Sequence, residues 1–175
     1  MTAGEVRRWQ RRVVPLLRRY AWSGVVIQRL ARRIQPRFTV GVVGVVLDAP
    51  RQRVLLVEHV FHTAYPWGLP GGWIERGEDP AQTAEREILE ETGLRVRAVQ
   101  PLIVQRGTTW SRHMDMVFLC ELDGDAQQVR LSGELLGYRW TPYDALPWLV
   151  AFHRQGIAAA LAAYDREPAA GFAGG

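Results

Sequence analysis

The stretch GWIERGEDPAQTAEREILEETGL, residues 72–94, carries the strongest structural signal in this chain. It contains Glu87, Glu90 and Glu91 at the spacing i, i+3 and i+4, which places all three on one face of any helix that carries them. Like charges so placed repel each other by about 0.2–0.5 kcal/mol per pair, a cost most easily explained if a cation lies between them. Oxygen ligands of this kind suit Mg²⁺ or Mn²⁺. The stretch therefore predicts a helix that presents a divalent metal site.

Capping signals indicate where this helix begins and ends. Asp79 is a favourable N-cap residue, and Gln82 stands three positions later, as in a capping box. Pro80 takes the first helical position, where its missing N–H costs nothing, and Gly93 is the residue type that ends helices. Apolar residues recur along one stripe of the helix at Ala81, Ala84 and Ile88. We expect this stripe to pack on a sheet while the acids face outward.

Neighbouring residues are expected to organise the three acids. Arg86 lies four residues before Glu90, so it can pair with Glu90 or with Glu78 in the preceding loop and hold these carboxylates in fixed rotamers. Ahead of the helix, the run LPGG at 69–72 lets the backbone approach a ligand closely, because glycine has no Cβ. We expect the carbonyl of Gly72 to be a further metal ligand.

The whole stretch resembles the signature box of the Nudix hydrolases, and every specified position is filled. A glycine is followed by five free positions, Glu78, seven free positions, and then the run R-E-apolar-any-E-E-any-G-apolar from Arg86 to Leu94. A solvated acidic helix face would explain the glutamates but not the arginine or the glycines. The resemblance covers about residues 38–165. It implies an α+β fold, an α/β/α sandwich with a mixed β-sheet.

The same resemblance implies a reaction. It is the Mg²⁺-dependent hydrolysis, with Mn²⁺ as the alternative ion, of a diphosphate bond in a nucleoside diphosphate linked to a group X; the products are a nucleoside monophosphate and phosphoryl-X. Glu87, Glu90, Glu91 and the Gly72 carbonyl would hold the metal against the diphosphate and help to activate a water. Several Nudix enzymes carry a loop glutamate before the last strand, and Glu134 is the matching candidate. Whether Glu91 or Glu134 acts as the base stays open.

Aromatic residues near the box are candidates for binding the substrate, because a nucleobase can stack on such rings. Trp67 is also expected to pack beneath the loop before the box, and Arg112 suits phosphate. The candidates are Phe61, Tyr65, Trp67, Trp110 and Arg112. Marks of the known subfamilies are missing, and Trp110 stands where ADP-ribose pyrophosphatases often carry proline. The substrate stays open among nucleoside triphosphates, including oxidised ones, nucleotide sugars and nucleoside diphosphates.

Outside the box the sequence predicts strands and one further helix. Apolar, β-branched runs predict a hairpin from 38–47 and 53–60, later strands near 96–105, 113–122 and 135–140, and a helix at about 149–164. A chain of 175 residues, 47% of them hydrophobic, can bury a core without disulfides. The lone Cys120 lies in an apolar run, which is typical of a core residue rather than a nucleophile, and suits a reducing cytoplasm.

Residues 1–37 differ from the rest in charge. They contain ten arginines against the single acid Glu5, about +9, whereas the remainder has twelve arginines against seventeen acids, about −5. Apolar spacing predicts helices within about 13–35, but neither a secretory signal nor a membrane span. We expect this segment to dock on the hydrolase domain or on a second copy in a homodimer; the alternatives are an anionic membrane surface and, least expected, nucleic acid. The predicted organisation is a basic helical extension at 1–37, a hydrolase domain at 38–167 and a flexible tail at 168–175.

Two rival functions fit the same sequence. A non-catalytic module of this fold would bind a nucleotide or RNA, although such modules usually lose acids of the box and this chain retains them all. A hydrolase at a membrane surface would act on a lipid-linked diphosphate and use the arginine-rich helix as its anchor. We expect instead a cytoplasmic enzyme with a small-molecule nucleotide substrate.

Overall fold

A computed structural model of the chain describes residues 37–48, 52–60, 64–107, 110–124 and 127–166, together with Val25, Arg29 and Gln35. Residues from Phe38 onward belong to one compact unit and those up to Arg37 to another. Val25 and Arg29 are helical, in agreement with the predicted helices. Apart from Val25, Arg29, Gln35 and Arg37, the residues of the helical extension lie outside the described residues, as does the tail at 168–175, so the predictions for their structure and partners stay predictions. No helix within the described residues is long and apolar enough to cross a membrane.

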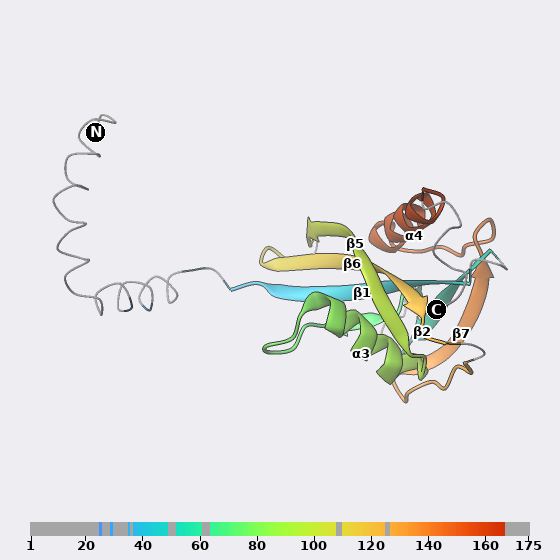
Figure 1. Cartoon of the computed structure of the whole chain (residues 1–175), viewed down its shortest axis with the longest axis horizontal. Coiled ribbons are helices and arrows are strands. Elements are labelled where there is room, and N and C mark those ends of the chain that lie inside the picture. Colours follow the sequence, from blue (N-terminus) through green and yellow to red (C-terminus); the bar gives the residue numbers. More distant parts are fainter. Residues whose placement is uncertain are drawn as a thin grey trace. The chain divides into compact units, whose positions relative to one another are not determined.

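A mixed β-sheet forms the centre of the second unit (Figure 1). Its strands are β1 (Thr39–Asp48), β2 (Arg53–His59), β3 (Trp67–Gly68), β4 (Gly71–Trp73), β5 (Val96–Arg106), β6 (His113–Leu122) and β7 (Leu135–Pro142). The main order is β3-β2-β1-β6-β5, with β4 paired to β1 and β7 paired to β2. β1 and β6 run parallel, and the other pairs are antiparallel. The predicted strands are thus confirmed.

The predicted hairpin between β1 and β2 forms, but it is short. Only its closing pairs, Leu47 with Val54 and Asp48 with Arg53, join the two strands. Along its other edge β2 pairs with β7 over its whole length, while β1 pairs along one edge with β6 and along the other with β4. The early separation of β1 and β2 therefore leaves an edge of β1 for β4, which begins the acidic stretch.

Two helices cover the two faces of this sheet, α3 (Pro80–Thr92) on one and α4 (Ala151–Tyr164) on the other (Figure 1). Ile88 of α3 is fully buried beside Val46 in one cluster, and Ile157 of α4 packs with Val45 in the second. Because successive residues of a strand point to opposite faces, β1 supplies both cores. Burial of each such side chain contributes about 1.5–3 kcal/mol. This arrangement confirms the predicted α/β/α sandwich.

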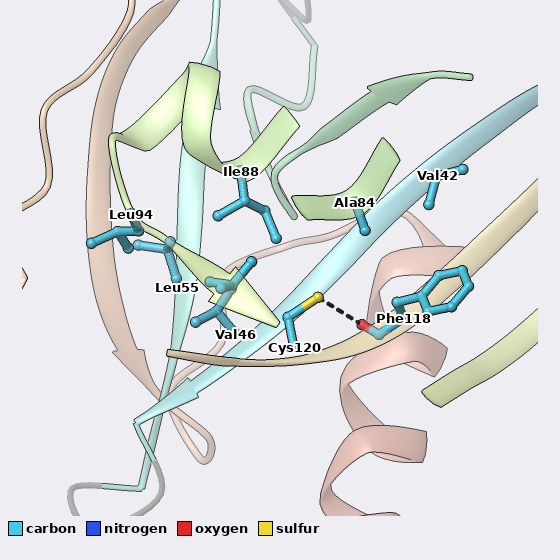
Figure 2. Packing of buried hydrophobic residues seen from close by; sticks show 9 residues of the cluster. Val42, Val46, Leu55, Ala84, Ile88, Leu94, Phe118 and Cys120 are labelled. Atoms are coloured by element: carbon cyan, nitrogen blue, oxygen red, sulfur yellow. Dashed lines mark hydrogen bonds between the residues drawn. The ribbon is translucent and has the colours of Figure 1, made fainter. Parts of the chain in front are cut away.

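Cys120 lies inside the cluster beneath α3, as Figure 2 shows. Its thiol is 3.9 Å from the carbonyl oxygen of Phe118, and burial raises the pKa of Cys120 to about 12. Across from it, Gly44 passes directly under Ile88: a Cβ at Gly44 would lie 2.4 Å from Ile88 Cδ1 and 3.0 Å from Cys120 Sγ. The predicted role of Cys120 as a core residue is confirmed, and α3 packs this close because position 44 has no side chain.

Candidate active site

Helix α3 is held at both ends as the sequence predicts. The backbone N–H of Asp79 donates to Gln82 Oε1 at 3.1 Å, and Pro80 is the first helical residue. At the other end Gly93 adopts a left-handed conformation, φ 71°, and its N–H donates to the Leu89 carbonyl. These caps fix the helix relative to the loop that precedes it, and thereby fix where its acids lie against β4.

The three acids of α3 differ strongly in burial. Glu91 is buried, with 8% of its surface exposed, and Glu87 is half-buried. Only Glu90, whose side chain is 59% exposed, faces solvent. The prediction that all three acids face outward is therefore wrong. Each helical residue is rotated by about 100° from the one before it, so the face that packs on β4 takes in Glu87 and Glu91 as well as the apolar stripe.

Arg86 connects most of the acids at this site. Its Nε and Nη2 donate to the two oxygens of Glu78 at 2.8 and 3.1 Å, and Nη2 also donates to the Trp73 carbonyl at 3.1 Å. Its Nη1 donates to Glu87 at 2.9 Å and to Glu90 at 3.0 Å. Hydrogen bonding from Arg86 lowers the pKa of Glu78 to about 2. Both predicted pairings of Arg86, with Glu78 and with Glu90, are confirmed.

Glu91 is the acid with the most perturbed environment. Burial raises its pKa to about 8, although its Oε2 accepts a hydrogen bond from the Gly71 N–H at 2.9 Å. The charges of Glu87, Glu134 and Glu90 raise its pKa further. The loop that carries Glu134 is tied to the helix end, since the Ser132 N–H donates to the Glu91 carbonyl at 3.0 Å. The structure thus brings Glu134 near the acids of α3, and burial likewise raises the pKa of Glu87.

The absence of a side chain at Gly72 lets the carboxylate of Glu87 pack against the sheet. A Cβ at Gly72 would lie 2.3 Å from Glu87 Oε1 and 2.6 Å from Oε2. The carboxylate therefore occupies the space that any other side chain at position 72 would fill. This close approach is the physical reason for a glycine at the start of the stretch.

The carbonyl of Gly72, in contrast, does not face the acids. Two backbone hydrogen bonds flank it in the β1–β4 ladder: Gly44 N–H to the Pro70 carbonyl, and Ile74 N–H to the Val40 carbonyl, both 3.0 Å. Residues 70, 72 and 74 thus turn their backbone polar groups toward β1, and the intervening residues turn theirs toward the free edge. The Gly71 N–H meets Glu91 on that edge, and the Gly71 carbonyl points the same way. The Gly72 carbonyl thus pairs toward β1, a direction that does not suit its predicted role as a metal ligand.

The donor set suits a hard divalent cation, although its side chains pair with protein groups. Among the described residues, no group of three or more His, Cys, Asp or Glu side chains is arranged around a metal position. Glu87 and Glu90 turn to Arg86 Nη1, and Glu91 turns to Gly71. Rotation of Glu87 and Glu90 would leave Arg86 held by Glu78 and by the Trp73 carbonyl. With only oxygen donors on a fixed framework, the site fits Mg²⁺ or Mn²⁺.

A cavity of about 620 Å³ lies on the α4 face of the sheet and adjoins the acids through β4. Its wall includes Gly71, Gly72 and Trp73 of β4, Trp110, and the side of β6 that carries His113 and Asp115. The first turn of α4 closes the opposite side. A ligand held at the β4 edge therefore has space for its remaining part directly beside the acids.

The predicted substrate residues separate into different places. Trp110 lines the cavity, whereas Tyr65, Trp67 and Arg112 are not among the residues that line it. Tyr65 stacks on Trp148 with ring centroids 3.5 Å apart. Trp67 is half-buried and packs beneath the guanidinium of Arg139, 3.9 Å from the ring centroid, as expected for a structural residue. Phe61 lies outside the described residues.

Sequence analysis also places His113 with Trp110 and Arg112 at a candidate rim, and His113 lines the cavity, but the sequence did not reveal Trp73 and Asp115 as cavity residues. Trp73 fills a free position of the box, so the motif says nothing about it. His113 and Asp115 are two positions apart and lie on the same face of β6. Only the pairing of Thr39 with His113 and of Gly41 with Asp115 shows which face this is. A period of two along the strand was a usable signal, but it does not say which face borders a cavity.

Comparison with known proteins identifies the relatives of this chain. A sequence model of the family described as the NUDIX domain matches residues 37–161. "Nudix hydrolase 6" of Arabidopsis thaliana is 30% identical over 118 residues, 62% of this chain and 42% of the relative. The "CMP-5'-(N-acetyl-N-hydroxy-3-aminopropyl)phosphonate hydrolase" of Streptomyces rubellomurinus is 45% identical over 106 residues, 57% of this chain and 50% of the relative. The chain thus spans half or less of the length of these two relatives.

Solved structures share the same fold. An ADP-ribose pyrophosphatase from Streptococcus suis superposes with a TM-score of 0.62 at 22% identity, over 77% of this chain and 96% of that one. A UDP-X diphosphatase superposes with a TM-score of 0.61 at 23% identity, over 79% of this chain and 70% of that one. These likenesses confirm the architecture that the acidic stretch implied.

Proposed function

This chain belongs to the Nudix family, and from that premise we propose that it hydrolyses the diphosphate bond of a nucleoside diphosphate linked to another group, in the presence of Mg²⁺. The products are a nucleoside monophosphate and the phosphorylated second group. Both curated relatives compared above are hydrolases by name, which supports an enzyme over a non-catalytic module of the same fold.

The observation that carries this proposal is the gathering of carboxylates at the free edge of β4. Glu87 and Glu91 are drawn against the strand, Glu90 lies beside them, and Glu134 is close enough to raise the pKa of Glu91. Arg86 offsets only part of this negative charge, so a bound cation would stabilise the site further. A bound cation would lower the pKa of Glu91, because its positive charge stabilises the carboxylate.

Each residue has a definable part in the reaction. A bound Mg²⁺ would neutralise the diphosphate and acidify a water. Glu87, Glu90 and the Gly71 carbonyl would hold the ion. Arg86, fixed by Glu78 and the Trp73 carbonyl, keeps Glu87 and Glu90 at the edge of β4.

Two residues are candidates for accepting the proton of the attacking water. Glu91 is held in one orientation by the Gly71 N–H, so its carboxylate is positioned to accept a proton at the edge of β4. Glu134 approaches the same region from an exposed loop. Both are retained in the proposal because either carboxylate can serve this purpose.

The test is hydrolysis of a panel of nucleoside triphosphates and nucleotide sugars by the purified chain, with and without Mg²⁺, with released monophosphate as the readout. We expect Glu90→Gln and Glu91→Gln to remain folded and to lower kcat by about 100-fold or more. Glu121→Gln is the matched control, because it removes a carboxylate that pairs with the exposed Arg97 on β5. Near-normal turnover in both box variants would refute the assignment.

A further inference from the structure

We propose that the cavity between β4, β6 and α4 binds the nucleobase of the substrate, that Trp73 and Trp110 form its stacking surface, and that Asp115 selects a base with two adjacent N–H donors, as guanine has. This inference rests on the proposed function, since it names the base of the same nucleotide. It concerns residues outside the acidic site.

Trp73 and Trp110 form an aromatic surface that a planar ligand can cover. Their ring centroids are 5.2 Å apart with an angle of 34° between the planes, and they are 48% and 52% exposed. The ring of His113 lies 5.2 Å from Trp73 and 5.6 Å from Trp110. The two indoles are too close together to admit a base between them. A base would therefore lie on their exposed faces, where stacking on aromatic rings stabilises any nucleobase.

Asp115 is held in a defined orientation beside this surface. Its Oδ1 is 2.9 Å from His113 Nε2, and His113 Nδ1 is 2.8 Å from Thr39 Oγ1. A carboxylate can only accept, so Nε2 is the donor in this pair. The His113 ring fits tightly between two glycines: a Cβ at Gly107 would lie 2.7 Å from its Cδ2, and one at Gly41 3.1 Å from its Nε2. His113 thus positions the carboxylate of Asp115.

The charge of the cavity indicates what part of the substrate it takes. Among the described residues that line it, Asp115 is the only Asp, Glu, Lys or Arg. No lysine or arginine among these lining residues is available to pair with phosphates, so the phosphates belong at the acids and the cavity suits an uncharged ring. An acceptor-only carboxylate favours N–H donors. Guanine presents N1–H and its 2-amino group side by side, which matches the two oxygens of a carboxylate.

The position of Trp73 connects the two sites. Its ring lines the cavity, while its backbone carbonyl accepts a hydrogen bond from Arg86 on the acidic side. The neighbouring Gly71 and Gly72 line the cavity and also contact Glu91 and Glu87. A base stacked on Trp73 therefore leaves its phosphates within reach of the β4 edge.

The experiment measures binding rather than turnover. Titration calorimetry in EDTA would give Kd for guanosine, inosine and adenosine 5′-monophosphates, since inosine lacks the 2-amino group and adenosine lacks N1–H. We expect the guanosine nucleotide to bind most tightly. Asp115→Asn should weaken its binding about tenfold and remove the preference. Trp73→Ala and Trp110→Ala should each weaken the binding of all three nucleotides about tenfold. Trp73→Phe and Trp110→Phe should retain most of the affinity.

Matched controls keep the test independent of folding. Trp148→Ala removes an equally exposed indole, and Asp144→Asn an exposed carboxylate, neither of which lines the cavity. Equal affinities for the three nucleotides in the wild type would overturn the selection by Asp115. Unchanged binding in folded Trp73→Ala and Trp110→Ala proteins would overturn the stacking surface. A chain that shows the expected binding but hydrolyses no diphosphate would overturn the proposed function alone.

Discussion

Substitution of Gly72 by alanine should disable the acidic site without unfolding the protein. The added Cβ would lie 2.3–2.6 Å from three atoms of the Glu87 carboxylate, whereas ordinary contacts of this kind begin at 3.4 Å. The carboxylate must therefore move by about 1 Å, a displacement that can cost about 100-fold in rate. Because Glu87 is a flexible side chain and Gly72 does not require a positive φ, we expect a loss of stability below about 1 kcal/mol.

The assay compares kcat at several Mg²⁺ concentrations with the free energy of unfolding in urea. Gly44→Ala is the reference for loss of stability, because its Cβ would lie 2.4 Å from Ile88 Cδ1 in the buried core. It should lose about 1–3 kcal/mol of stability. Full kcat in Gly72→Ala, or a loss of stability equal to that of Gly44→Ala, would refute the reasoning.

Three further predictions follow from the charges and burial around the site. Because the pKa of Glu78 is lowered, its pairing with Arg86 stabilises the folded protein above pH about 4.5, and this stabilisation disappears as the pH falls toward about 2. The difference in unfolding midpoint between wild type and Glu78→Gln should therefore shrink over that range, and a constant difference would contradict the prediction. Cys120, with its pKa raised to about 12, should resist iodoacetamide at pH 8 until the chain is unfolded in guanidinium, whereas alkylation at the rate of a free thiol would show that the cluster opens. Mg²⁺ at about 100 times its Kd should raise the free energy of unfolding by about 2.7 kcal/mol, and an equal rise in Glu90→Gln would place the ion elsewhere.

Much of the acidic site can be predicted from the local sequence. The capping pair of Asp79 and Gln82, the end at Gly93, and the reach of Arg86 to Glu90 depend on residues within a few positions of one another. Such contacts follow from the geometry of a single helix, so spacing predicts them well. The exception is the Gly72 carbonyl, because its direction depends on which residues of β4 face β1.

The amino-acid sequence alone determined the helix of residues 80–92, its acids and its family, since periodicity and capping act within one element. Only the tertiary structure decided that Glu91 is buried while Glu90 is exposed, and that Gly71 meets the acids. It also brought Trp73 and Asp115, 42 positions apart in the chain, to one cavity. Those two residues line one cavity because β1 pairs with β4 on one edge and with β6 on the other, and long-range pairing of this kind leaves no local trace in the sequence.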